Sequence, residues 1–208
     1  GNDIVLGNRG DDTLYGGAGE DYVHGGKGDD LLIVSGVDDA YDTLNGGLGS
    51  DTLRSLDGDI VLDGFLLDSI EVIDSATGVL RGTADANFMY LNGTTWAAGS
   101  GTVAAGDGND WVVGTDGGDT LLGEGDDDRL FGNRGDDSLV GGAGDDFMLG
   151  NFGDDTIVAG GGDFAHGGRG DDVLRFDGML AGDRATLDGG VGTNVLELDL
   201  TQAQRADA

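Results

Sequence analysis

The chain has 208 residues and no cysteine, which excludes a disulfide framework and thiolate metal sites. Its formal net charge of −31, from 41 acidic and 10 basic residues, disfavours nucleic acid and anionic lipid as partners. With 45 glycines, no proline and no long apolar run, the sequence also excludes collagen, a proline-rich linker and a transmembrane helix.

The first 54 residues repeat a nine-residue pattern, with glycine at places one and four, aspartate at place six and an aliphatic residue at place eight. The pattern opens partway through, with GNDIVL, which predicts that the chain is a fragment of something longer. Because the hydrophobic residues recur at fixed places, we prefer a folded chain to the disorder that an acidic, glycine-rich composition alone favours. The units are 7–15, 16–24, 25–33, an irregular twelve-residue unit 34–45, and 46–54.

From residue 55 to 104 the pattern lapses. Residues 59–74 are rich in β-branched and aliphatic side chains, which is typical of strands. Residues 82–90 keep the nine-residue spacing but have Asn87 at place six. Two interpretations are open, namely further coils that have lost their metal-binding turns, which we prefer, or a small inserted β lobe.

The pattern resumes at residue 105 and runs to Arg175, after which it weakens again, with Asn194 at place six of the last unit. The stretch from Gly7 closely matches the stretch from Gly132, and the order of units after each is the same. The chain thus holds one module of roughly 120 residues and most of a second, as in tandem repeat arrays. We predict four segments: repeat block 1–54, degenerate coils 55–104, repeat block 105–175, and a truncated degenerate continuation 176–208.

The spacing of the residue types has a physical reason. Glycine enters positive φ freely, so G-x-x-G permits a tight turn with exposed carbonyls. The place-six carboxylate beside those carbonyls gives a set of oxygen ligands that suits a hard cation such as Ca²⁺. The last three places can form a brief strand whose place-eight side chain points to one side, which predicts a stacked parallel roll. This column includes Leu130, Leu139, Met148, Ile157, Ala165 and Leu174.

The pattern resembles the G-G-x-G-x-D-x-U-x repeat of RTX proteins, the hemolysin-type calcium-binding nonapeptide. The resemblance implies an all-β, right-handed parallel β-roll, a solenoid in which two units form one coil and units n and n+2 stack. It implies Ca²⁺ between stacked turns, bound by turn carbonyls and by place-six carboxylates. Asn87 and Asn194 depart from the pattern. The implied metal ligands are Asp3, Asp12, Asp21, Asp30, Asp42, Asp51, Asp110, Asp119, Asp128, Asp137, Asp146, Asp155, Asp163 and Asp172.

The charge supports cation binding independently of the resemblance. Carboxylates stacked one coil apart would repel each other without counter-ions. On the order of ten Ca²⁺ ions would cancel about two-thirds of the negative charge, at one ion per gap. Aspartates that merely form Asx-turns would explain one or two repeats, but not so long a column.

Other residues are predicted to be structural. The place-five acids, such as Asp11 and Asp136, are expected to face solvent, and His24 and His166 are expected on the outer surface. Trp96 and Trp111 are expected to pack against neighbouring loops. Because the sequence has no H-E-x-x-H, no G-x-S-x-G and no phosphate-binding loop, we do not expect an enzyme.

The resemblance implies export from bacteria by type I secretion and folding in extracellular calcium. We expect a secreted or cell-surface structural module of a surface-layer or adhesin-like protein, with calcium ions, self-association or cell-surface contacts as partners, and no nucleic acid or membrane insertion. The alternative is the accessory C-terminal region of a secreted protease, lipase, epimerase or toxin. A carbohydrate- or ice-binding surface ranks last. It would need an unbroken outward row, which the place-seven threonines Thr13, Thr52, Thr120 and Thr156 do not form.

Overall fold

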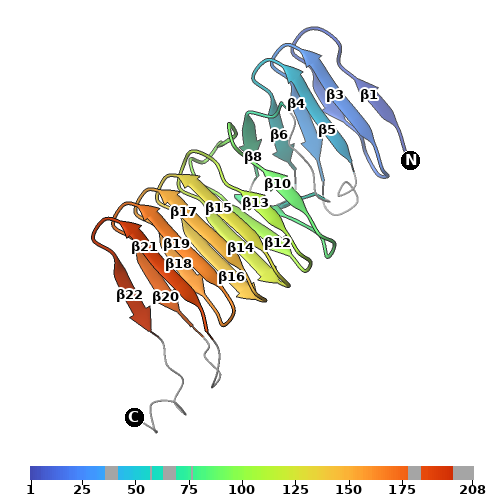
Figure 1. Cartoon of the computed structure of the whole chain (residues 1–208). Coiled ribbons are helices and arrows are strands. Elements are labelled where there is room, and N and C mark those ends of the chain that lie inside the picture. Colours follow the sequence, from blue (N-terminus) through green and yellow to red (C-terminus); the bar gives the residue numbers. More distant parts are fainter. Residues whose placement is uncertain (36–41, 57, 63–68, 76, 178–183, 199–208) are drawn as a thin grey trace.

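The computed structural model describes residues 1–35, 42–56, 58–62, 69–75, 77–177 and 184–198. All regular elements in these ranges are strands, and every strand pair is parallel. The strands stack coil upon coil along one direction from the N-terminus to the C-terminus (Figure 1). The predicted all-β parallel roll is therefore confirmed. No helix that could cross a membrane occurs in these ranges.

In the first block, odd and even strands belong to different sheets, so two consecutive units make one coil. Strands β1, β3 and β5 form one sheet, and β2, β4 and β6 belong to another. Leu14 lies beside Leu32, and Leu32 lies beside Leu53. Half of the irregular unit 34–45, residues 36–41, lies outside the described residues. The strands are β1 (Ile4–Leu6), β2 (Thr13–Tyr15), β3 (Tyr22–Lys27), β4 (Leu31–Val34), β5 (Thr43–Leu48) and β6 (Thr52–Ser55).

The strands of the middle segment pair in parallel with the strands of both blocks. β8 pairs with β6 and β11 pairs with β8, while β9 pairs with β7 and β12. Three short strands, β8, β9 and β10, precede the return to β11, so a coil here has three strands in place of two. The division of the chain into four segments stays a prediction. These strands are β7 (Ile60–Val61), β8 (Val72–Asp74), β9 (Val79–Arg81), β10 (Phe88–Tyr90) and β11 (Thr95–Trp96).

The second block continues with two strands in each coil. One face is the sheet β10-β13-β15-β17-β19-β21, and the other is the eight-stranded sheet that runs from β7 to β22. The strands are β12 (Thr102–Gly106), β13 (Trp111–Val113), β14 (Thr120–Gly125), β15 (Arg129–Arg134), β16 (Ser138–Ala143), β17 (Phe147–Phe152), β18 (Thr156–Ala159), β19 (Phe164–Arg169), β20 (Val173–Phe176), β21 (Thr186–Val191) and β22 (Val195–Leu198).

A regular strand spans places seven to nine and then places one to three of the next unit, which leaves only places four to six for the turn. Burial alternates along it, so the place-eight side chain and the place-one glycine both face the interior. The place-eight residues of both blocks form the hydrophobic core as predicted, with Leu130 and Leu139 fully buried.

The place-one glycines are needed for space and not for backbone conformation. Positive φ occurs at place two, as in Asn133 (79°), and at place four, as in Gly135 (105°), whereas Gly132 at place one does not adopt it. A Cβ on Gly132 would instead overlap Oδ2 of Asp137 and the carbonyl oxygen of Gly150. The absence of a side chain at place one thus leaves an interior space beside the carboxylate.

We expect Leu139→Ala to lower the free energy of unfolding by about 2–5 kcal/mol, because Leu139 is fully buried between Leu121 and Ile157. The control is Val140→Ala, which removes a partly exposed side chain of the same strand and should cost less. Urea unfolding in saturating calcium measures both losses. Equal losses would contradict the inward direction of place eight.

Candidate metal-binding turns

In each repeat block the place-six aspartates form two ladders, one along each edge of the roll. At each step the backbone N–H of one aspartate donates a hydrogen bond to Oδ1 of the aspartate one coil further on, as from Asp119 to Asp137 (2.8 Å) and from Asp137 to Asp155 (2.9 Å). The sequence-predicted pairing of units n and n+2 is thus the pairing in the structure. In the first block one ladder holds Asp3, Asp21 and Asp42, and the other holds Asp12, Asp30 and Asp51 and ends at Glu71. In the second block one ladder starts at Asn87 and holds Asp110, Asp128, Asp146 and Asp163, and the other holds Asp119, Asp137, Asp155 and Asp172 and ends at Asn194.

Nearly all of the predicted ligand residues are buried, each with at most 3% of its surface exposed. The exceptions lie in the first coil, where Asp3 is exposed and Asp12 is partly buried. Asp163 keeps its place in the ladder although its unit is one residue short. The buried members are Asp21, Asp30, Asp42, Asp51, Asp110, Asp119, Asp128, Asp137, Asp146, Asp155, Asp163 and Asp172.

Ten of these carboxylates have a buried Oδ2 atom without any hydrogen-bond partner. A buried, unsatisfied carboxylate oxygen is costly, so a native structure needs a partner for it. In the Gly132 turn, Oδ2 of Asp137 and the carbonyl oxygen of Gly150 converge on the space that a Cβ would fill. The same arrangement recurs at Gly25, Gly123, Gly150 and Gly167. The ten are Asp12, Asp21, Asp30, Asp51, Asp110, Asp128, Asp137, Asp146, Asp155 and Asp172.

This donor set fits a calcium ion, because Ca²⁺ prefers carboxylate and carbonyl oxygens. Within the described ranges, no three histidine, cysteine or acidic side chains converge as in a metal centre built from side chains alone. A turn that combines a carboxylate with backbone carbonyls needs no such cluster. Ligation by the individual aspartates stays a prediction.

The electrostatics of the ladders in the second block show why a counter-charge is needed. Burial raises the pKa of Asp137 to about 8, and it raises the pKa values of Asp128 and Asp155 to about 7. The pKa values of Asp110 and Asp146 rise to about 6 for the same reason. Backbone hydrogen bonds oppose the rise, and neighbouring carboxylates add to it. Without a cation, part of each ladder would therefore hold protons near neutral pH.

Four predicted ligands, Asp3, Asp42, Asp119 and Asp163, are not among the ten, and in two of them the turn itself supplies a partner for Oδ2. Oδ2 of Asp119 accepts a hydrogen bond from the Thr115 backbone N–H (2.6 Å), and Oδ2 of Asp163 accepts one from the Gly160 N–H (2.6 Å). Sequence reasoning also missed Glu71, whose Oε2 accepts the Asp51 N–H at 2.7 Å. No pattern in the sequence pointed to Glu71, because the nine-residue spacing is lost around it.

The place-five aspartates have a second role that was not predicted. They are exposed as expected, but their Oδ1 atoms accept backbone N–H groups from the next coil, as between Asp29 and Asp11 (2.9 Å) and between Asp145 and Asp127 (2.9 Å). This second series of hydrogen bonds runs opposite to the place-six ladder and braces the same turns. The consecutive aspartates at places five and six were the available signal.

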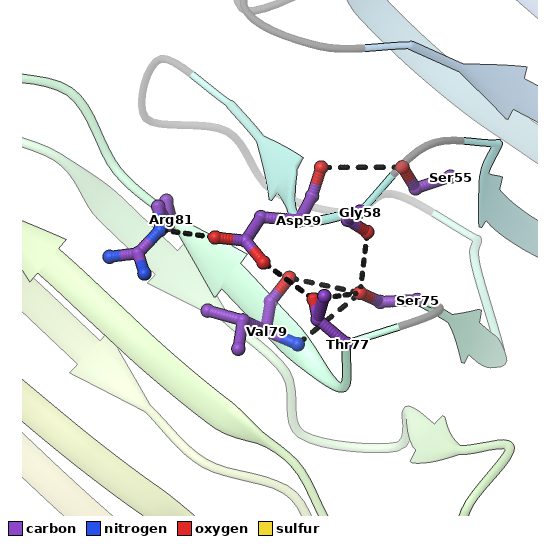
Figure 2. A network of polar contacts seen from close by, with 7 residues as sticks. All are labelled: Ser55, Gly58, Asp59, Ser75, Thr77, Val79 and Arg81. Carbon is purple, nitrogen blue, oxygen red and sulfur yellow. Dashed lines mark hydrogen bonds and ion pairs between the residues drawn. The ribbon is translucent and has the colours of Figure 1, made fainter.

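In and next to the middle segment, arginine side chains form ion pairs with aspartates that do not belong to the ladders. The carboxylate of Asp59 contacts the Arg81 guanidinium and accepts a hydrogen bond from Thr77 Oγ1 at 2.5 Å (Figure 2). These two groups hold the pKa of Asp59 below its ordinary value, with the Thr77 hydrogen bond as the larger cause. Arg54 and Asp74 form a second such bridge between coils, at 2.6 Å.

The outer faces of the second block carry rows of like side chains. Trp111 is 41% exposed and stacks on Phe131, with ring centroids 5.4 Å apart, instead of packing under a loop. Trp96 is buried as expected. On the opposite face Ser138 lies between Thr120 and Thr156, so the place-seven row is continuous in hydroxyl groups although not in threonines.

Comparison with protein families identifies the repeat. The model of the RTX calcium-binding nonapeptide repeat (4 copies) matches more than half of the chain, and no curated protein matches the sequence. The matched ranges contain every predicted ligand residue. They are residues 1–32, 38–59, 104–139, 131–163 and 158–175.

We expect the chelated protein to gain β-structure as the pH falls from 8 to 5. The folded-state pKa of Asp137, about 8, and those of Asp128 and Asp155, about 7, lie above the unfolded value near 4, so the folded state binds more protons in this window. Its stability without calcium therefore falls as the pH rises through these values. Far-UV circular dichroism in chelator at several pH values measures this. A β-signal that grows with rising pH would contradict the origin assigned to the shifts.

Proposed function

The chain belongs to the RTX calcium-binding nonapeptide repeat family, and from this membership we propose that it is a structural segment, folded by calcium, of a protein that bacteria export. The observation that carries the proposal is the set of ten buried Oδ2 atoms without a hydrogen-bond partner. Calcium bound at these turns would supply the missing partner and the missing positive charge together.

Calcium binding is coupled to folding because the turns exist only when the coils are stacked. In turns such as those of Gly123, Gly132 and Gly150 the carboxylate lies beside a carbonyl oxygen of the next coil, so the unfolded chain has no preformed site. Binding free energy then becomes folding free energy. The net charge of −31 keeps the chain expanded where calcium is scarce, and calcium outside the cell triggers folding.

The role we propose outside the cell is that of a stiff scaffold in a surface-layer or adhesin-like protein. Each coil contacts mainly its two neighbours, so the segment extends by adding modules without changing its cross-section. Divalent ions at successive turns would lock each coil to the next. The scaffold role assigns no catalytic residue to the chain.

We expect calcium titrated into chelator-stripped protein at pH 8 to produce a cooperative change from a disordered to a β-type far-UV circular dichroism spectrum. Mg²⁺ at equal concentration should not produce it, because Mg²⁺ demands octahedral geometry and gives up its water reluctantly. Light scattering on the same samples tests self-assembly, which the surface-layer role requires. A full β-spectrum in chelator at pH 8, unchanged by calcium, would refute calcium-dependent folding.

A further inference from the structure

Two turns of the roll depart from the regular pattern in the same way. They span residues 82–87 and 114–119, and each has threonine at place two, where regular units have mostly glycine or asparagine. The Thr83 backbone N–H donates to Asn87 Oδ1 at 2.7 Å, and the Thr115 N–H donates to Asp119 Oδ2 at 2.6 Å. In both turns the place-six side chain is thus bound by its own turn.

The threonine hydroxyls complete the same network in both turns. Thr115 Oγ1 donates to Asp119 Oδ2 at 2.9 Å, and it accepts the Gly117 N–H at 3.1 Å. Thr83 Oγ1 accepts from Asn87 Nδ2 at 3.2 Å and from the Asp85 N–H at 3.4 Å. An asparagine, which cannot supply a negative charge to a cation, therefore fits this turn as well as an aspartate does.

The backbone explains why threonine changes the turn. In regular turns the place-two residue has positive φ, as in Asn133 (79°) and Gly142 (111°). A β-branched residue strongly disfavours that region. No residue of 82–87 or 114–119 adopts positive φ. These turns follow a different path, in which the place-two N–H points to the place-six side chain.

The second oxygen of Asp119 is also satisfied by the protein. Its Oδ1 accepts a hydrogen bond from the indole Nε1 of Trp96 at 2.8 Å. Asp137, one coil further on the same edge, is equally buried but has no partner for Oδ2. Neighbouring carboxylates in one ladder therefore differ in whether they need a cation.

We propose that threonine at place two closes the turn in place of calcium, so that Asp119 binds no ion and the calcium stack on this edge begins at Asp137. The inference rests on the proposed calcium binding by the place-six carboxylates. Asn87 heads the other ladder of the second block with the same closed turn. The two calcium stacks of the second block thus each begin next to a turn that is held closed by hydrogen bonds alone.

The test compares Asp119→Asn with Asp137→Asn and counts bound ions by native mass spectrometry at saturating calcium. Asp137→Asn should bind one ion fewer than the unaltered protein, whereas Asp119→Asn should bind the same number. Asn87 shows that an asparagine fits the closed turn, so Asp119→Asn should keep the β-type circular dichroism spectrum.

The outcomes distinguish a failure of the closed-turn inference from a failure of the proposed calcium binding. If both variants lose an ion, Asp119 is a ligand and the closed-turn inference fails, while calcium binding by the ladder stands. If neither loses one, the ladder carboxylates are not ligands, and the proposed function fails with the inference. If Asp119→Asn does not fold, the number of ions bound by Thr115→Asn tests the inference instead, because this variant restores a regular place-two residue. One additional ion would support the closed turn, and an unchanged count would overturn it.

Discussion

The structure depends on the burial of carboxylates that are stacked one coil apart. Burial, with a smaller contribution from neighbouring carboxylates, raises the pKa of Asp137 to about 8. The backbone is shaped around this constraint, because the glycines at place one leave space beside the carboxylate oxygen and the positive φ values at places two and four form the turn. The core cannot offset such a cost alone, since each unit contributes chiefly one aliphatic side chain, such as Leu130 or Leu139, to a thin hydrophobic column.

The carboxylates of the chain, buried in the ladders and partly exposed in the middle segment, find partners in three ways. In regular turns one oxygen takes a backbone N–H and the other is left for a cation, as at Asp137. In the middle segment a guanidinium provides the positive charge, as between Arg81 and Asp59. In the threonine turns the protein supplies every hydrogen bond, as at Asp119. The carboxylates that have a buried oxygen without a protein partner therefore occur at some turns and not at others.

Much of the architecture could be predicted from the repeat. A period of nine with an aliphatic residue at place eight fixes one inward position per unit, and Leu121, Leu130 and Leu139 all lie there. The predicted stacking of units n and n+2 placed Asp119 beside Asp137 and Asp137 beside Asp155. The repeat alone nonetheless makes all place-six aspartates look equivalent. It also suggests that the place-one glycines serve backbone freedom, whereas these glycines are needed to leave space beside the carboxylate.

The aspartate and aliphatic columns follow from the repeat alone, because a strict period places the same residue type at the same point of every coil. Some partners of the ladder residues became visible only in the folded chain, because they come from segments where the period fails. Trp96 reaches Asp119, and Glu71 continues the ladder of Asp51, across intervals of 23 and 20 residues that no nine-residue spacing predicts. The paths of those irregular coils depend on how three short strands pack on each neighbouring coil. That packing, and not the repeat, brings Trp96 to Asp119 and Glu71 to Asp51.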